Sequence, residues 1–272
     1  MLREARRALT SSFLSNMIYN YHTHTARCGH AVDADEDYVR RAIEAGIKYL
    51  GFSDHAPLVF PDGYEGDWRV PTSEAEEYVT SIRHLREKYK DKLQLNVGFE
   101  MEYYPRYFEQ MFDSARKIGA EYLILGQHFI LNEHPDGIGS VGPTDDERRL
   151  STYVDEVITA MNTGVFTYVA HPDITCFIGD GEVYRLEITR LCLASRESGV
   201  PLEINLLGIR NKKHYPAETF WHIAGEVGAP VTIGFDAHAS RDFLNKEQHI
   251  KAAELIEKYN LNYIGMPKLR FI

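Results

Sequence analysis

The sequence is poor in cysteine, has no long apolar run and has no excess of basic residues. The three cysteines, Cys28, Cys176 and Cys192, lie at unrelated spacings, so they predict neither a disulfide framework nor a Cys-x-x-Cys metal pair. Reduced thiols of this kind are typical of a cytoplasmic protein. No apolar run approaches the roughly 18 residues that a membrane-spanning helix needs. Forty acidic and thirty basic residues give a net charge of −10, which argues against a surface for nucleic acid or anionic membranes.

The first residues are the segment whose composition comes nearest to that of a leader. Arg3, Arg6 and Arg7 precede a weakly apolar stretch. Several serines interrupt this stretch, and no small-residue cleavage site follows it. We therefore expect residues 1–272 to form a single domain in which residues 1–16 are a frayed extension, with Met17 as an alternative start.

Short β-branched or aromatic runs alternate along the chain with longer stretches of helical periodicity. Seven such pairs predict an α/β fold with a parallel sheet and crossover helices. The predicted strands are Met17–His22, Tyr49–Ser53, Leu93–Glu100, Tyr122–Gln127, Phe166–His171, Pro201–Asn205 and Val231–Asp236. The predicted helices are Asp35–Ala45, Ser73–Tyr89, Tyr107–Ile118, Asp146–Met161, Val183–Ser198, Ala217–Val227 and Lys246–Tyr259. Two long loops, at 56–72 and 131–144, follow strands, on the side where barrel enzymes place their chemistry.

Nearly every predicted strand ends in a side chain that can bind a metal ion. His22 and His24 lie two residues apart at the end of the first strand, so both can point to one face. The other strands end in Asp54, His55, Glu100, Glu102, His128, His171, Asp173, Glu203, Asn205, Asp236 and His238. One such histidine is more often a satisfied core or surface group. Burying the whole set at one barrel mouth is costly unless its members are paired or metal-bound, and such donors suit Zn²⁺, Mn²⁺ or Fe²⁺.

The order of these motifs resembles that of a known family. The motifs are HTHTxxCGHA, SDHAP, GxE, QHF, AHPD and a late DAH, and they extend from Ile18 to about Ala239. They are similar to those of the polymerase-and-histidinol-phosphatase (PHP) superfamily, and within it the chain most resembles the monofunctional histidinol-phosphate phosphatases. The resemblance implies the PHP fold, a distorted seven-stranded (β/α)7 TIM-like barrel with a cluster of three divalent metal ions.

The resemblance also implies a set of nine ligands in three groups. They are His22, His24, Glu100 and Asp236 for the first metal, the shared Glu100 with His128 and His171 for the second, and His30, His55 and His238 for the third. His30 is assigned only through the resemblance, because a loop histidine is more often solvated. Asp54 has no ligand role in this scheme, and we expect it to orient an imidazole.

The implied activity is hydrolysis of a small phosphate monoester, L-histidinol phosphate in histidine biosynthesis. Three divalent ions would make the local field positive despite the net charge, and a metal-bridging hydroxide would attack phosphorus. Glu100, Asp236 and His238 are the predicted catalytic residues. Arg210 is predicted to contact the phosphate. His134 is a candidate proton donor to the leaving group, although a solvated loop histidine is the simpler interpretation.

The identity of the substrate stays open at this point. Glu102, Asp173 and Glu203 are available to contact the amine and imidazole of histidinol, but helix capping or neighbouring ion pairs explain them equally well. Residues 126–128 read Gly-Gln-His, whereas the family's histidinol phosphatases more often have Ser-Val-His. The alternatives are a PHP-type phosphatase or phosphodiesterase for another small ester or phosphotyrosine, and a non-catalytic metal-binding module. The sequence does not decide between metals or between oligomeric states.

Overall fold

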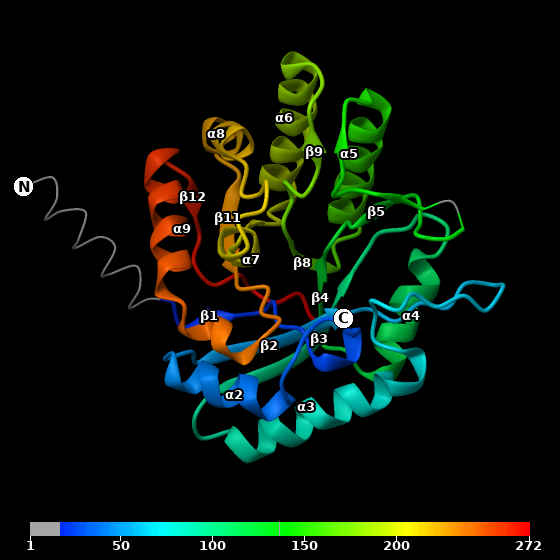
Figure 1. Cartoon of the computed structure of the whole chain (residues 1–272), viewed down its shortest axis with the longest axis vertical. Coiled ribbons are helices and arrows are strands. Elements are labelled where there is room, and N and C mark those ends of the chain that lie inside the picture. Colours follow the sequence, from blue (N-terminus) through cyan, green and yellow to red (C-terminus); the bar gives the residue numbers. More distant parts are fainter. Residues whose placement is uncertain (1–16, 136) are drawn as a thin grey trace, which may run out of the picture.

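The computed structural model describes residues 17–135 and 137–272, so the prediction for residues 1–16 falls outside the described range. A sheet of eight parallel strands runs through the molecule in the order β1-β2-β3-β4-β8-β10-β11-β12. It curls around its own inner face (Figure 1). The strands are β1 (Tyr19–Asn20), β2 (Tyr49–His55), β3 (Gln94–Met101), β4 (Tyr122–Leu125), β8 (Phe166–Val169), β10 (Leu202–Asn205), β11 (Pro230–Gly234) and β12 (Asn262–Tyr263).

The sheet confirms the predicted α/β class and all seven predicted strands. The eighth strand, β12, was not predicted, because it has only two residues, which pair with Pro230 and Val231 of β11. The two ends of the curl meet beyond β1 and β11, where His24 N donates to Ala237 O at 3.0 Å and Ala237 N donates to His22 O at 3.2 Å. The result is a distorted TIM-like barrel whose strand ends converge on one side.

The seven predicted helices are also present, and most of them connect neighbouring strands. Asp146 begins one of them by accepting hydrogen bonds from the N–H groups of Arg148 and Arg149, which stabilises a helix by roughly 1 kcal/mol. These helices are α2 (Asp35–Glu44), α3 (Ala75–Tyr89), α4 (Phe108–Ile118), α5 (Glu147–Asn162), α6 (Gly181–Ser198), α8 (Glu218–Val227) and α9 (Lys246–Lys258).

Smaller elements fill the connections on the side of the strand ends. One of them, η1, carries the residues just before His30, and another, α7, follows β10 directly. They are η1 (Ala26–Cys28), η2 (Thr72–Glu74), α7 (Leu206–Arg210), η3 (Ser240–Leu244) and the two-residue strands β5 (Phe129–Ile130), β6 (Ile138–Gly139), β7 (Pro143–Thr144) and β9 (Cys176–Phe177). Within the described residues, no helix is both long enough and apolar enough to cross a membrane.

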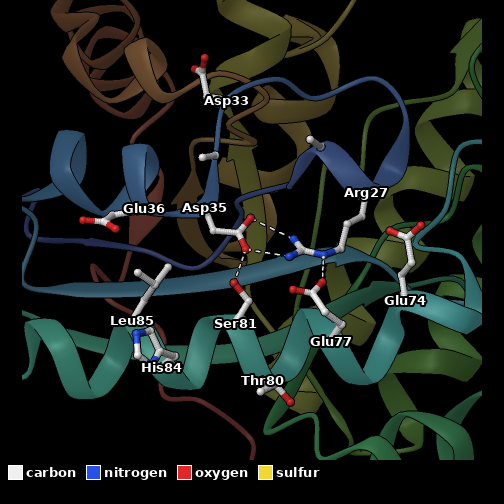
Figure 2. A pocket seen from close by; sticks show the side chains of 12 residues that line it. Arg27, Asp33, Asp35, Glu36, Glu74, Glu77, Thr80, Ser81, His84 and Leu85 are labelled. Carbon is white, nitrogen blue, oxygen red and sulfur yellow. Dashed lines mark hydrogen bonds and ion pairs between the residues drawn. The ribbon is translucent and has the colours of Figure 1, made fainter.

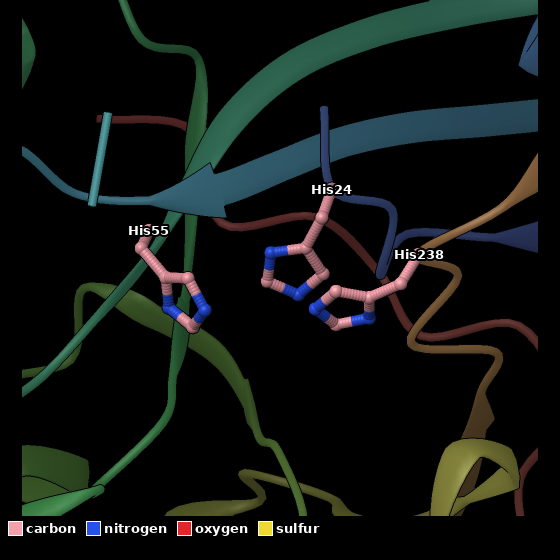
Figure 3. A group of neighbouring side chains, drawn as sticks. All are labelled: His24, His55 and His238. Carbon is pink, nitrogen blue, oxygen red and sulfur yellow. The ribbon is translucent and has the colours of Figure 1, made fainter. Parts of the chain in front are cut away.

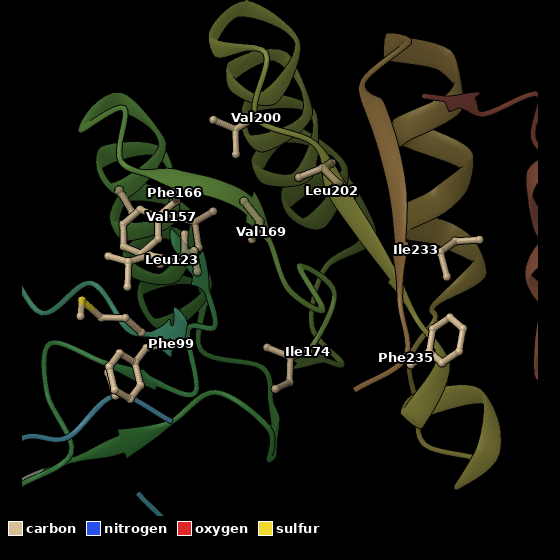
Figure 4. Packing of buried hydrophobic residues seen from close by; sticks show 14 of the residues in the cluster. Phe99, Leu123, Val157, Phe166, Val169, Ile174, Val200, Leu202, Ile233 and Phe235 are labelled. Atoms are coloured by element: carbon tan, nitrogen blue, oxygen red, sulfur yellow. The ribbon is translucent and has the colours of Figure 1, made fainter. Parts of the chain in front are cut away.

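The outer face of the sheet packs against the helices and forms the main core. Leu123, Val157 and Phe166 belong to this core and bring β4, α5 and β8 together (Figure 4). Burial of one such side chain contributes roughly 1.5–3 kcal/mol. Along β3, Val97 and Phe99 belong to the same core. Glu100 lies between Phe99 and Met101 of this core, so its side chain points to the opposite, inner face of the sheet.

The inner face of the sheet holds two layers of side chains. The first, here called the tyrosine layer, consists of Tyr19, Tyr21, Tyr122 and Tyr168, which cluster with Ile124, Ala170 and Leu269. A Cβ atom at Gly98 would lie 2.2 Å from Tyr122 O, so glycine is required for Tyr122 to cross the inside of the sheet. The second layer lies at the carboxyl ends of the strands and contains the predicted metal ligands.

Candidate metal centre

The structure brings the nine predicted ligands together at the carboxyl ends of the strands. The rings of His24 and His238 stack with centroids 4.1 Å apart, and those of His24 and His55 are 4.5 Å apart. These three rings point toward one another in Figure 3. His30 lies on the outer side, with its ring centroid 4.9 Å from that of His238. We call these nine side chains the ligand layer.

Glu100 lies at the centre of the ligand layer. A Cβ atom at position 126 would be 2.0 Å from Glu100 Oε1, so Gly126 leaves the space that this carboxylate occupies. The two carboxylate oxygens lie 2.8–3.7 Å from ring nitrogens of five histidines, which are His22, His24, His55, His128 and His171. This position is the one expected of a carboxylate shared between two metal groups.

Asp236 faces Glu100 from the other side of the layer. Its Oδ1 lies 3.2 Å from His24 Nε2, 3.6 Å from His22 Nε2 and 3.2 Å from His238 Nδ1. Asp236 has φ 48° and His171 has φ 30°. These left-handed conformations cost free energy in residues other than glycine and cluster at functional sites. The backbone is thus strained at two points where a side chain is turned into the layer.

Several donor atoms of the ligand layer are buried without a hydrogen-bond partner. Among the described residues, no partner is found for His22 Nε2, His24 Nε2, His55 Nδ1, His171 Nδ1, Glu100 Oε2 and Asp236 Oδ1. One unsatisfied buried polar atom costs roughly 1–3 kcal/mol, so six in one place form an expensive arrangement unless something binds them. Imidazole and carboxylate donors in such groups are the ligands of Zn²⁺, Mn²⁺ and Fe²⁺. These residues could therefore hold divalent metal ions.

Carboxylates behind the ligand layer hold three of the imidazoles by their Nδ1 atoms. Oxygens of Glu203, Glu102 and Asp54 lie 2.8 Å from His22, 2.8 Å from His128 and 3.4 Å from His24, respectively. This leaves the Nε2 atom of each ring directed into the layer, the arrangement that orients metal-binding histidines in proteins. Asp54 thus has the orienting position that the sequence predicted.

The three acidic residues considered for substrate contacts all have other partners. Glu102 and Glu203 orient imidazoles, as described above. Asp173 accepts hydrogen bonds from Ala217 N at 2.6 Å and Trp221 Nε1 at 2.9 Å, at the start of α8. Burial raises the pKa of Asp173 to about 6. The ion-pair and helix-capping interpretations are therefore the ones that the structure supports for these residues.

The pKa values in the ligand layer depend on burial and on the charges of the carboxylates and imidazoles in and behind the layer. Burial alone would lower the pKa of His22, but Glu203, Asp236 and Glu100 raise it to about 10. Burial alone would raise the pKa of Glu100, but His128, His22 and His55 hold it well below its ordinary value. Metal ions that bind here must displace protons from imidazoles, because only the neutral ring is a ligand.

A cavity of about 840 Å³ opens onto the ligand layer. Trp68, Phe129 and Tyr215 form aromatic parts of its wall, and Asp67 and Lys213 are among its polar groups. Of the residues lining it in the part of the chain that the structure describes, Lys213 is the one with a permanent positive charge. The sequence offered little signal for these five residues, because they come from loops whose mutual approach no periodicity predicts.

Arg210 does not lie in the wall of this cavity. Its guanidinium donates to the carbonyl oxygens of Phe235 and Asp236, to Gln248 Oε1 and to Asp242 Oδ2, at 2.8–3.1 Å. The structure gives no support to the prediction that Arg210 holds a phosphate, because these acceptors already engage its N–H groups. Arg210 instead supports the chain segment that carries Asp236.

His134 is also placed away from the cavity. Its Nε2 lies 2.8 Å from Asp62 Oδ2, and its ring stacks on Tyr64 with centroids 3.9 Å apart. It joins the loops at 56–72 and 131–144 near the surface. These contacts favour a structural loop histidine over a proton donor to a leaving group.

A buried ion network ties the same two loops to the ligand layer. Arg69, which is 1% exposed, donates to Glu102 Oε2 at 2.7 Å and pairs with Glu133. Its guanidinium also lies over the ring of Trp68 at 4.0 Å. Because Glu102 in turn holds His128, Arg69 connects both covering loops with a predicted ligand. The sequence placed Arg69 in a loop but offered no sign of these partners.

Cys28 is a buried neighbour of the ligand layer that the sequence did not single out. Its Sγ lies 3.8 Å from His30 Nε2. Burial raises the pKa of this thiol, but hydrogen bonds with His24 and His30 outweigh burial and lower it. By contrast, burial raises the pKa of Cys192 to about 12. All three cysteines are free, as predicted.

Comparison with known proteins agrees with this geometry. The model of the PHP domain matches residues 20–206. The chain therefore belongs to the PHP family. It is 28% identical to the "Probable histidinol-phosphatase" of Deinococcus radiodurans over 80% of this chain and 85% of that protein. It is 26% identical to the histidinol-phosphatase of Lactococcus lactis over 88% and 90% of the two chains.

Two solved structures share the fold. The histidinol phosphate phosphatase of Lactococcus lactis, complexed with zinc, L-histidinol and phosphate, superposes with a TM-score of 0.68 at 20% identity over 91% of this chain and 95% of that chain. A chain from the structures of metal-dependent tyrosine phosphatases of Bacillus subtilis and Streptococcus pneumoniae superposes with a TM-score of 0.52 at 13% identity, over 93% of this chain and 99% of that chain. Both comparisons identify the fold, a curled parallel sheet with the PHP arrangement.

Proposed function

We propose that this protein is a metal-dependent phosphomonoesterase that hydrolyses L-histidinol phosphate to L-histidinol and phosphate. The observation that carries the proposal is the ligand layer, with six buried donor atoms that lack partners among the described residues, beside a cavity. The histidinol-phosphatases among its relatives extend over most of the chain. The Lactococcus lactis enzyme of the same fold was seen with zinc, L-histidinol and phosphate.

Three divalent ions are proposed to be held in the groups that the resemblance implies. Glu100, Asp236 and His238 would serve catalysis by holding these ions, with the remaining six histidines as further ligands. When bound, such ions would supply a water molecule that loses its proton near neutral pH and would polarise the phosphoryl oxygens. Zinc is the first metal to test, because imidazole-rich groups suit it and the Lactococcus lactis structure contains it.

The cavity wall offers groups for both halves of such a substrate. Lys213 lines the cavity and would pair with the phosphate, the role that the sequence analysis assigned to Arg210. Asp67 is a carboxylate in the wall that the hydrogen bonds of the ligand layer do not use, and it suits a substrate amine. Trp68, Phe129 and Tyr215 provide aromatic surface for an imidazole ring, which stacks favourably on such groups.

The test is a panel of phosphate esters assayed on protein reconstituted with zinc, manganese or ferrous iron. The panel contains L-histidinol phosphate, phosphotyrosine, p-nitrophenyl phosphate and a phosphodiester. We expect kcat/KM for L-histidinol phosphate to exceed the others by at least about tenfold, a difference that a few polar contacts supply. Asp236→Asn is the inactive control. Indifference to L-histidinol phosphate would refute the substrate, and no turnover of any ester by metal-loaded protein would refute the activity.

A phosphotyrosine substrate is the second candidate, because the aromatic wall would accept a phenyl ring as well as an imidazole. The same panel separates the two: preference for phosphotyrosine would assign the cavity to an aryl phosphate. In that case Asp67→Asn should leave kcat/KM unchanged, since phosphotyrosine as a free ester or in a peptide does not require a carboxylate at this position.

The role of Lys213 has a matched control in its neighbour. Replacing Lys213 by alanine should raise KM roughly tenfold or more, because a hydrogen bond to a charged group is worth about 1.5–3 kcal/mol. Lys212→Ala changes the same charge next to it, at a residue that does not line the cavity. Equal effects of the two variants would contradict a direct contact by Lys213.

A further inference from the structure

Cys28 lies where an ion held by the outer histidines would be bound. Donor atoms of Cys28, His30 and His238 lie within 4.8 Å of one another. Those of His24, His55 and His238 form a second such group. The two groups share His238, so the thiol belongs to the same cluster of donors as the outermost metal position of the proposed function.

The orientation of His30 directs its free nitrogen toward this thiol. Its Nδ1 lies 2.8 Å from Cys28 O, which leaves Nε2 as the ligand atom. Nε2 is 3.8 Å from Cys28 Sγ. A sulfur at about 2.3 Å and a nitrogen at about 2.1 Å from one tetrahedral zinc lie about 3.6 Å apart. The spacing of Sγ and Nε2 is therefore close to that of two ligands of one ion.

Metal binding at the neighbouring histidines would remove the hydrogen-bond partners of the Cys28 thiol. Cys28 is 0% exposed, and its ring partners are His24 and His30, both predicted ligands. When these rings turn their nitrogens to metal ions, the thiol loses its hydrogen-bond partners. In the second group, His24 Nε2 and His55 Nδ1 are buried and have no hydrogen-bond partner among the described residues. Coordination satisfies sulfur and nitrogens together.

The loop that carries Cys28 is held rigidly from outside. Arg27 donates to both carboxylate oxygens of Asp35 at 2.9 Å and to Glu77 Oε2 at 2.8 Å (Figure 2). Ser81 Oγ donates to the same Asp35 at 2.6 Å. These bonds connect η1, which contains Cys28, with α2 and α3.

We infer that Cys28 Sγ is a ligand of the outermost metal ion, beside His30 and His238, in addition to the nine predicted ligands. On binding, the thiol releases its proton to solvent and a sulfur–metal bond forms. A mixed sulfur and nitrogen set is softer than one of imidazole and carboxylate alone, so it favours Zn²⁺ or Co²⁺ over Mn²⁺ at this position. The inference rests on the metal binding of the proposed function.

Cobalt provides the direct test, because a sulfur–cobalt bond gives an intense near-ultraviolet charge-transfer absorption that nitrogen and oxygen ligands do not give. The full-length protein is stripped of metal and titrated with Co²⁺, and bound metal is counted. Cys28→Ser is compared with Cys192→Ser and Cys176→Ser. Cys192 is as buried as Cys28, and Cys176 is partly exposed. We expect the absorption in the wild type and in both controls, and its loss in Cys28→Ser.

Zinc-loaded wild type offers a second measurement that needs no variant. X-ray absorption should show a zinc–sulfur distance of about 2.3 Å beside the nitrogen and oxygen distances of about 2.0–2.2 Å.

A chelator competition measures the contribution of the thiol to affinity. Cys28→Ser should bind its weakest ion at least about tenfold less tightly, because loss of even an outer partner of a metal site has an effect of this size.

The outcomes separate this inference from the proposed function. Wild-type protein that binds metal and hydrolyses a phosphate ester without any sulfur signal would overturn the inference alone. A sulfur signal that persists in Cys28→Ser would overturn it too. Wild-type protein that binds no divalent metal would overturn both.

Discussion

The ligand layer and the tyrosine layer occupy the inner face of the same curled sheet, yet they differ in how their polar atoms are satisfied. Tyr122 Oη lies 2.9 Å from Tyr21 O and 3.1 Å from Phe52 O, and Tyr19 Oη lies 3.0 Å from Thr232 Oγ1. In the ligand layer, Glu100 Oε2 and Asp236 Oδ1 are buried without a hydrogen-bond partner in the described part of the chain.

Most polar atoms of the tyrosine layer bond within the protein, whereas several donor atoms of the ligand layer are left for a bound ion. The hydroxyl groups of Tyr19, Tyr21 and Tyr122 find partners within the protein, whereas Tyr168 Oη is buried with none among the described residues. Bulky rings fill the space that Gly51 and Gly98 leave. The ligand layer gathers charges that mutual pairing does not satisfy, and carboxylates behind it hold the imidazoles with their free nitrogens inward. We therefore expect substitutions in the first layer to affect stability and those in the second to affect metal binding and activity.

Replacing Glu100 by glutamine should have the largest effect. The amide keeps the shape but removes the charge that five histidines surround, so activity should fall by more than the roughly 10–100-fold typical of outer partners of a metal site. Metal content, measured after reconstitution with zinc, should fall together with activity. Full metal content with full activity would show that Glu100 is not a ligand.

Glu203→Gln should have the next largest effect, because Glu203 orients a predicted ligand without being one itself. Its carboxylate holds His22 Nδ1 at 2.8 Å and accepts from His171 N at 3.0 Å. Zinc affinity measured by chelator competition should fall by roughly 10–100-fold, and excess zinc should restore activity. Failure of zinc to restore activity would indicate a role other than orienting His22.

The pH dependence of the metal-free protein should reveal the charge of the ligand layer. The pKa of His22 is raised from 6.5 to about 10 in the folded state. Because the pKa of His22 is raised on folding, its protonation stabilises the folded state. This stabilisation is complete below pH 6.5, the ordinary pKa, and is lost as the pH rises through about 10. Urea unfolding of metal-free protein should therefore show declining stability over this range.

Zinc-loaded protein supplies the control for this pH series. Metal ions replace the protons on the imidazoles, so its stability should depend less on pH over the same range. Identical pH profiles with and without zinc would contradict metal binding at His22.

Tyr122→Phe should have the smallest effect, confined to stability. It removes a hydroxyl group whose acceptors, Tyr21 O and Phe52 O, are buried. The free energy of unfolding in urea should fall by about 1–3 kcal/mol, while zinc content and kcat stay unchanged. A loss of bound zinc in this variant would mean that the two layers are coupled, and the contrast between them would fail.

The strand–helix units were predictable from sequence because each depends on local signals. Seven strands and seven helices follow from hydrophobic runs, periodicity and caps such as Asp146. β12 escaped prediction because two residues carry no periodicity and pair only where β11 has been placed. The side of the sheet that carries the chemistry was also predictable, since the carboxyl ends of parallel strands share one edge.

Partners of charged side chains were far less predictable. The sequence did not decide whether Glu102 and Glu203 contact substrate or pair with neighbouring residues. In the structure, both contact imidazoles of the ligand layer. Arg210 was predicted to contact a phosphate, and Arg69 was left unassigned in the loop at 56–72. One supports the chain beside Asp236, and the other is buried between Glu102 and Glu133. Residues far apart in sequence supply these partners, so no local pattern contains them.

By itself, the sequence determined the kinds of donor atoms and the strand ends at which they stand, since residue type and alternation act over a few residues. Only the tertiary structure decided which donors face each other, which are left without partners, and that Cys28 lies beside His30 and His238. The physical reason is that curling the sheet brings strand ends from positions 22 to 238 within a few ångströms of one another. Whether the strand ends converge in this way depends on the packing of all the strands together.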